Sequence, residues 1–182
     1  MARIIILNGA GSAGKSSIAR ALQEIADKPF LLVAMDAFID MLPASYWGHP
    51  EGFAPEPASS PYGPAVAIRT GSVGARTLAG MRRAVAALAG AGNDLIVDEV
   101  MLSAEWEDYK LLLAGFDVSL VSVFAPLAVL EERERQRGDR MIGLARWQFD
   151  RVHQGLTYDL EVDTSKATPA ECALKIKQAF GI

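Results

Sequence analysis

The sequence predicts an α/β fold in which helices cover both faces of a parallel sheet. Three observations lead to this expectation. Short apolar runs typical of buried strands alternate with segments whose apolar residues recur about every 3.6 positions. A glycine-rich turn at Gly9–Ser16 separates the first such run from the first helical segment. The chain has 182 residues, 51% of them hydrophobic, which suits one domain spanning residues 1–182 with a substantial core.

The predicted elements follow one another along the whole chain. The first strand, Arg3–Asn8, is a β-branched run of the kind found in central parallel strands. The second, Phe30–Asp36, ends in an acid, and one or two helical turns are expected over Ala37–Leu42. Further strands are predicted at Asp94–Asp98, Val118–Phe124 and Leu160–Asp163, and helices at Lys15–Ala26, Ser72–Ala91, Ala104–Leu113, Leu127–Arg137, Leu144–Gln154 and Pro169–Phe180.

The segment Pro43–Pro64 is expected to form no regular element. It holds six of the nine prolines, and such a density interrupts helices and central strands. It also carries the aromatic residues Tyr46, Trp47, Phe53 and Tyr62. A disordered surface loop and a loop that binds the acceptor of a reaction both fit this composition. The interleaved aromatic residues favour the acceptor-binding loop.

Composition and charge exclude several classes of protein. The net charge of −4 and the pI of about 5.2 give no basic surface for DNA or RNA. The only cysteine, Cys172, cannot form an internal disulfide, which favours a reducing compartment. The longest apolar stretch, Leu111–Leu130, is interrupted by Asp117 and Pro126, and no signal peptide is recognised. We therefore expect a cytoplasmic protein with no nucleic-acid or membrane partner, and the sequence leaves its oligomeric state open.

The turn at Gly9–Ser16 matches the phosphate-binding pattern G-x-x-x-x-G-K-[ST] at every fixed position. Its glycines let the backbone approach phosphate oxygens closely, and successive N–H groups at a helix start form an anion nest. Lys15 is expected to reach the β- and γ-phosphates, and the Ser16 hydroxyl to coordinate Mg²⁺. The residues predicted to bind the triphosphate of ATP are Gly9, Ala10, Gly11, Ser12, Ala13, Gly14, Lys15, Ser16 and Ser17.

Two further acids stand at the ends of predicted strands. Asp98 closes the apolar run that begins at Leu95, and a carboxylate there can hold Mg²⁺ beside Ser16. Glu99 follows directly and is expected to face either the metal or the acceptor. Asp36 is placed where it could take the proton of an acceptor hydroxyl, although the same residue could instead cap the helical turn that follows.

Arginines gather in the charged run Glu131–Arg140. Arg133, Arg137 and Arg140 are four and three residues apart, so they share one face while the segment is helical. We expect a lid at about residues 133–143 in which Arg133 and Arg137 stabilise the transferred phosphoryl group. A solvated helix with Glu–Arg pairs is the alternative.

Seven segments together resemble chloramphenicol phosphotransferase and its relatives, which are small P-loop kinases. They are Ile5–Gly9, Ser12–Ser16, Asp36 with Pro43, Ile96–Val100, Arg137–Arg140, Val152–Gly155 and Tyr158–Thr164. The resemblance implies a three-layer P-loop NTPase fold with a central five-stranded parallel sheet, similar to shikimate and nucleotide kinases. It also implies ATP-dependent transfer of the γ-phosphate to a primary hydroxyl of chloramphenicol.

The resemblance also implies roles for individual residues. The family's catalytic aspartate falls on Asp36, its lid arginines on Arg133 and Arg137, and the stretch containing Thr164 would lie near the adenine. The chain departs from the family's pattern at Ala37, where the antibiotic kinase has serine, and throughout the Pro-rich segment. Both departures concern the region where an acceptor would bind.

The sequence therefore predicts a kinase that uses ATP and Mg²⁺ to phosphorylate a hydroxyl of a small molecule. Phe38, Met41 and Trp47 are expected to line an apolar acceptor pocket. A nucleoside or nucleotide kinase would need basic residues near Asp36, and Phe30–Ile68 contains no Arg or Lys. No Asn-Lys-x-Asp motif for guanine is present. Two alternatives remain: a nucleoside or nucleotide kinase, whose acceptor phosphate Arg69, Arg76 or a lid arginine could reach, and an ATP-binding regulator without catalysis.

Overall fold

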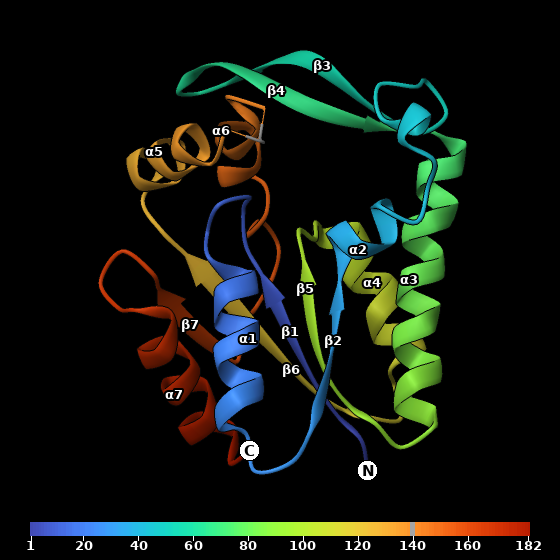
Figure 1. Cartoon of the computed structure of the whole chain (residues 1–182), viewed down its shortest axis with the longest axis vertical. Helices are drawn as coiled ribbons and strands as arrows, with labels where there is room; N and C mark the ends of the chain where they lie inside the picture. Colours follow the sequence, from blue (N-terminus) through green and yellow to red (C-terminus); the bar gives the residue numbers. More distant parts are fainter. Residues whose placement is uncertain (139–140) are drawn as a thin grey trace.

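The computed structural model describes residues 1–138 and 141–182, and its centre is a five-stranded parallel sheet (Figure 1). The strand order is β2-β5-β1-β6-β7, and every neighbouring pair in it is parallel. The five-stranded sheet expected from the family resemblance is thus confirmed. The strands are β1 (Arg3–Asn8), β2 (Phe30–Ala34), β5 (Asp94–Glu99), β6 (Asp117–Phe124) and β7 (Leu160–Asp163).

Helices cover both faces of the sheet because the central strands are apolar on both sides. In β1, Ile4 and Ile6 belong to one buried cluster, and Ile5 and Leu7 belong to the other. This alternation follows from the two-residue period of a strand. The first cluster is closed by α3 (Ser72–Gly90) and α4 (Ser103–Leu112), and the second by α1 (Lys15–Ile25) and α7 (Pro169–Phe180).

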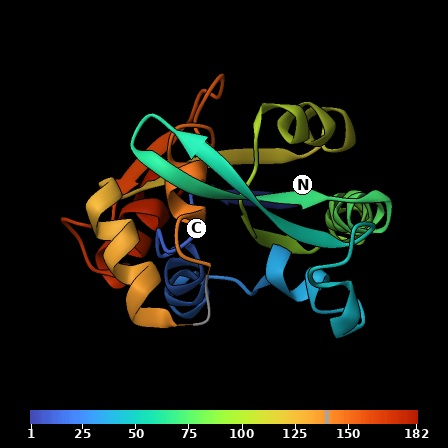
Figure 2. The ribbon, with the colours of Figure 1, turned by 90° about the horizontal axis from the view of Figure 1, so that it is seen from above.

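The Pro-rich segment is not irregular, which corrects the expectation from the sequence. It contains a 3₁₀ turn at Ala44–Tyr46, the whole of strand β3 (Phe53–Ser60) and the start of β4 (Gly63–Thr70). The two strands form an antiparallel hairpin that arches over the carboxyl edge of the sheet (Figures 1 and 2).

The hairpin tolerates its prolines because an N–H group at their positions would point away from the partner strand and make no hydrogen bond with it. Val66 pairs with Pro57, yet the Val66 N–H donates to the Gly143 carbonyl outside the hairpin, at 3.1 Å. That pair therefore exchanges no hydrogen bonds between the strands. Pro55 and Pro64 each lie two residues before a member of that pair, so they also belong to pairs without hydrogen bonds between the strands. No hydrogen bond of the hairpin is therefore lost at either proline.

Helix α2 (Met35–Ile39) begins one residue after β2 ends. Strand β2 therefore ends two residues before the predicted end at Asp36. Asp36 lies in the first turn of α2 rather than at the end of a strand. The residue that caps the helix is Ala34, so the capping alternative for Asp36 is not what the structure has. The strand ends there because Ala34, paired with Asp98, is its last residue with a neighbour in β5.

Helices α5 (Leu127–Arg137) and α6 (Leu144–Phe149) pack on each other beside one end of the hairpin. Helix α6 ends five residues before the predicted Gln154, because turns replace the helix after Phe149. Within the described ranges, no helix has the length and hydrophobicity to cross a membrane.

Candidate active site

The phosphate-binding loop follows β1 and curls around the ammonium group of its own lysine. Lys15 Nζ donates to the carbonyls of Gly9 and Ala10 at 2.9 and 3.1 Å, and the side chain is buried. Gly9 is needed because a Cβ there would lie 2.3 Å from the Val123 carbonyl oxygen. Gly14, with φ at 94°, adopts a left-handed conformation that other residues rarely take. The loop thus closes around Lys15 through the backbone carbonyls of Gly9 and Ala10.

Ser16 and Asp98, the pair predicted to bind Mg²⁺, lie within hydrogen-bonding distance of each other beside this loop. Ser16 Oγ donates to Asp98 Oδ2 at 2.5 Å, and Lys15 Nζ lies 3.9 Å from Asp98 Oδ1. Asp98 is buried, so its charge is held close to the ammonium group and poorly screened. A hydroxyl and a carboxylate are hard oxygen donors of the kind that Mg²⁺ takes.

Arg133 is fixed against the loop on the side of β7. Its guanidinium donates to Thr164 Oγ1 and to the Thr164 carbonyl, both at 2.8 Å, and to the Ser12 carbonyl at 3.4 Å. Thr164 Oγ1 in turn donates to the Ala13 carbonyl at 2.9 Å. The structure therefore brings Arg133, which is predicted to be a lid arginine, and Thr164, which is predicted to lie near the adenine, against the phosphate loop.

Arg137 lies on the last turn of α5, four residues beyond Arg133, with its side chain exposed. Arg140, the third arginine of the predicted face, and Asp139 lie outside the described residues. Of the predicted lid at about residues 133–143, the structure describes residues 133–138 and 141–143.

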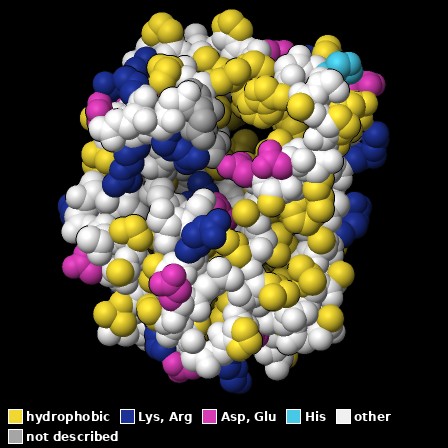
Figure 3. Space-filling view, in the orientation of Figure 1, with side chains coloured by type: hydrophobic (Ala, Val, Ile, Leu, Met, Phe, Trp, Pro, Cys, Tyr) yellow, Lys and Arg dark blue, Asp and Glu magenta, His cyan; other side chains and the backbone are white. Residues whose placement is uncertain are grey.

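Asp36 lies in the first turn of α2, directly after strand β2. It follows Ala34 by two residues, and Ala34 pairs with Asp98 across β2 and β5. Its side chain is exposed. Figure 3 shows a hollow beneath the hairpin, with basic side chains gathered on the α5–α6 side and acidic side chains on the α2 side.

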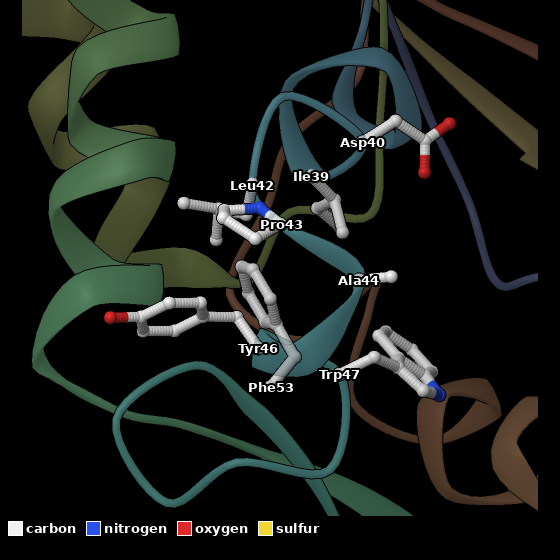
Figure 4. A pocket seen from close by; sticks show the side chains of 8 residues that line it. All are labelled: Ile39, Asp40, Leu42, Pro43, Ala44, Tyr46, Trp47 and Phe53. Atoms are coloured by element: carbon white, nitrogen blue, oxygen red, sulfur yellow. The ribbon is translucent and has the colours of Figure 1, made fainter.

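An apolar pocket of about 580 Å³ lies between α2 and the base of the hairpin (Figure 4). Trp47 lines it, as expected, but Phe38 and Met41 do not. Phe38 instead packs against the core cluster under α3, and Met41 is 73% exposed. The residues that line the pocket are Ile39, Asp40, Leu42, Pro43, Ala44, Tyr46, Trp47 and Phe53.

Glu99 does not face the hollow, contrary to expectation. It is 1% exposed and accepts a hydrogen bond from the Tyr109 hydroxyl at 2.5 Å, with Arg82 Nη1 3.7 Å from its other oxygen. Adjacent strand residues point to opposite faces, so Asp98 reaches the phosphate loop and Glu99 the α3–α4 layer. Burial raises the pKa of the Glu99 carboxyl to about 7, and the Tyr109 hydroxyl and Arg82 oppose this shift.

Two polar residues near the loop escaped the sequence analysis. The side-chain oxygen of Gln148 accepts a hydrogen bond from the Gly11 backbone nitrogen at 2.6 Å. Glu134 is 2% exposed and accepts from the nitrogens of Gly143 and Ala145 at 2.7 and 2.8 Å, which holds the start of α6. The only available signal was helical spacing: Glu134 is three residues from Arg137 and four from Leu130, a core residue.

The family profile described as chloramphenicol phosphotransferase-like protein matches residues 2–181. A relative in Mycobacterium tuberculosis (strain H37Rv), named "Putative O-phosphotransferase", is 28% identical over 184 aligned positions, which cover 98% of this chain and 82% of the relative.

Solved structures that resemble the chain include several kinases. The tunicamycin resistance protein of Deinococcus radiodurans superposes with a TM-score of 0.68 at 19% identity, covering 100% of this chain and 97% of that one. The APS kinase CysC of Mycobacterium tuberculosis, in complex with AMPPNP and APS, gives 0.67 at 16% identity, covering 100% and 98%. Shikimate kinase from Acinetobacter baumannii, in complex with shikimate, gives 0.59 at 12% identity, covering 99% and 93%.

At these identities the likeness concerns the fold, which is that of the P-loop kinases. The match to the family profile shows which family the chain belongs to, because it spans nearly the whole chain. The chain therefore belongs to the chloramphenicol phosphotransferase-like family, and it is a kinase of the P-loop type.

Proposed function

We propose that the protein transfers the γ-phosphate of Mg·ATP to a hydroxyl group of a small, uncharged molecule. The observation that carries this proposal is the contact between Ser16 and Asp98 at 2.5 Å, next to the ammonium group of Lys15. It places a hydroxyl, a carboxylate and a cation at the mouth of a phosphate-binding loop. These are the groups that phosphoryl transfer from a magnesium-bound triphosphate requires.

The loop from Gly9 to Ser17 would hold the phosphates through its backbone amides and Lys15. Ser16 and Asp98 supply oxygen donors that suit Mg²⁺, which would neutralise charge on the β- and γ-phosphates when bound. Thr164, fixed between Arg133 and the Ala13 carbonyl, would border the nucleotide on the β7 side. Each proposed role thus matches the groups that the residues offer, which are N–H donors and an ammonium group for phosphate and oxygen ligands for Mg²⁺.

Asp36 is the proposed base. It would accept the proton of the acceptor hydroxyl while the hydroxyl oxygen forms the new bond to phosphorus and ADP departs with the electrons of the broken bond. Arg133 and Arg137 share one face of α5 and would stabilise the charge on the transferred group. The proposed lid is the segment at about residues 133–143. The hairpin of β3 and β4 would cover the acceptor.

The acceptor is proposed to carry an apolar or aromatic portion and no negative charge. The pocket of about 580 Å³ has the size of a drug-like ligand site and presents the rings of Tyr46, Trp47 and Phe53. Asp40 is the only carboxylate among its lining residues, and Phe30–Ile68 supplies no Arg or Lys. The family description names chloramphenicol, so chloramphenicol is the first acceptor to test.

A coupled assay of ADP release with a panel of hydroxyl acceptors tests the proposal. We expect turnover that depends on both Mg·ATP and an apolar neutral acceptor, with chloramphenicol included in the panel. Turnover only with nucleosides or nucleoside monophosphates would instead identify a nucleotide kinase. Tight Mg·ATP binding without turnover on any acceptor would favour a regulator and contradict the proposal.

A further inference from the structure

The tip of the β3–β4 hairpin is fastened to helices α5 and α6. The Arg146 guanidinium, on α6, donates from Nη1 to the Pro64 carbonyl at 2.8 Å and from Nε to Glu131 on α5 at 2.6 Å. The Val66 N–H donates to the Gly143 carbonyl at 3.1 Å, just before α6 begins. One arginine side chain on α6 therefore joins α5 to the hairpin.

The base of the hairpin is fastened on the acceptor side. Gly71, which follows β4, donates its N–H to the Gly52 carbonyl at 2.8 Å, and the Gly48 N–H donates to the Phe53 carbonyl at 2.8 Å. Phe53 begins β3, is 3% exposed and lines the apolar pocket. The hairpin therefore spans the hollow, with its tip at α5 and α6 and its base at the pocket (Figure 1).

Helices α5 and α6 also contact the phosphate-binding loop. Arg133 on α5 donates to the Ser12 carbonyl at 3.4 Å, and Gln148 on α6 accepts from the Gly11 N–H at 2.6 Å. The two helices pack on each other. A continuous series of contacts therefore runs from the loop through α5 and α6 to the hairpin, and along the hairpin to the acceptor pocket.

We propose that Arg146 is a positioning residue through which Mg·ATP, bound at the phosphate loop, reduces the conformational freedom of the acceptor pocket. The inference rests on the proposed binding of Mg·ATP. A nucleotide that contacts Arg133 would hold α5, and a hairpin joined to α5 by Arg146 would lose freedom with it. An acceptor that enters an already ordered pocket has less conformational entropy to lose, so each substrate would favour the binding of the other.

A guanidinium suits this role because its planar fork donates in several fixed directions. The Nε and Nη1 groups of Arg146 reach acceptors on two different elements at once. The ammonium group of a lysine is a point charge and cannot hold both contacts in this geometry. The side chains of Arg146 and Glu131 are 27% and 24% exposed, so water screens their ion pair less than it screens a fully exposed one.

Hydrogen exchange of the full chain, followed by mass spectrometry with and without Mg·AMPPNP, tests the proposal. Exchange of a hydrogen-bonded amide reports the free energy of local opening. In the wild type, the nucleotide should slow exchange of the Gly48 and Gly71 amides by about fivefold or more, besides slowing exchange in the phosphate loop. Arg146→Met and Arg146→Lys should lose most of the slowing at the hairpin base and keep the slowing in the loop.

Arg135→Met is the matched control, because Arg135 lies on α5 and pairs with Glu132 of the same helix. It should show the same slowing as the wild type. A merely structural role of Arg146 would speed exchange equally with and without nucleotide, so the ratio of the two rates would not change in either Arg146 variant. That result would overturn the proposal. Thermal unfolding establishes that each variant is folded.

Two outcomes in the wild type separate this inference from the proposed function. Slower exchange in the phosphate loop, with no change at Gly48 and Gly71, would contradict the role of Arg146 and leave the nucleotide site intact. If Mg·AMPPNP slows exchange nowhere in the chain, the proposed function fails and this inference fails with it.

Discussion

The Ser16 hydroxyl lies 2.5 Å from Oδ2 of Asp98, although 82 residues separate them in the chain. The register of the sheet accounts for this contact, because Asp98 pairs with Leu7 of β1 and the phosphate loop begins two residues after Leu7. Parallel neighbouring strands end at the same edge, so their following segments meet there. The proposed magnesium site is thus a consequence of strand order.

Asp98→Asn should raise the Mg²⁺ concentration needed for half-maximal turnover by about tenfold or more. The amide keeps the shape of the side chain but removes the charge that would hold the ion. A magnesium titration of the steady-state rate at saturating ATP measures this. Asp117→Asn, at the opposite edge of the sheet, is the matched control, and an equal effect of both substitutions would remove Asp98 from the metal site.

Asp36→Asn should lower kcat by roughly a hundredfold or more, the usual contribution of a general base, and leave the Kd for Mg·ATP nearly unchanged. Single-turnover kinetics and calorimetry on the same preparation separate the two quantities. Glu24→Gln, an exposed change at the end of α1, is the control. A variant that keeps its full kcat would show that another group takes the proton.

Trp47→Ala should raise the KM for the acceptor by about tenfold, since a large ring is lost from the pocket, with little change in the KM for ATP. Met41→Ala should change neither value, because Met41 is 73% exposed and does not line the pocket. The pair of variants, compared in initial-rate kinetics, distinguishes the observed pocket from the one expected from the sequence. A larger effect at Met41 would place the acceptor elsewhere.

The Glu99 carboxyl should make stability depend on pH. Its pKa is raised from 4.5 to about 7, mainly by burial, so the folded chain binds this proton more tightly than the unfolded chain does. The stabilisation is complete below the unfolded pKa and is lost as pH rises through the folded one. Glu99→Gln cannot ionise but still accepts from Tyr109. The Tm of the wild type should therefore fall more than that of the variant between about pH 5 and pH 7.5. Parallel changes in Tm would show that Glu99 titrates normally.

Local patterns in the sequence predict most of the sheet and the phosphate site. Leu127–Arg137, Leu160–Asp163 and Pro169–Phe180 have the predicted bounds. The last of them is marked at both ends, by the capping box of Thr168 and Glu171 and by Gly181. The approach of Asp98 to Ser16 follows from the apolar run that precedes it. Because successive side chains of a strand point to opposite faces, the sequence could also have predicted that Glu99 points away from the site that Asp98 faces.

The hairpin and the Gln148 contact could not be predicted in this way. Proline density alone excludes a central strand, but Pro55 and Pro57 lie where an isolated hairpin needs no N–H, and that depends on pairing with β4. The bond from Gly11 to Gln148 joins residues 137 apart. No local pattern specifies it, because the packing of α6 against α5 and the hairpin brings the two together.

Calorimetric titration of the wild-type chain and of Lys15→Ala with Mg·ATP tests the central claim most directly. We expect the wild type to bind one Mg·ATP per chain. The variant should bind at least about tenfold more weakly, because it lacks the buried ammonium group of Lys15 that would contact the phosphates. Absence of heat of binding to a well-folded wild-type chain, or equal affinity of the two proteins, would contradict the assignment of Gly9–Ser16 as the nucleotide site.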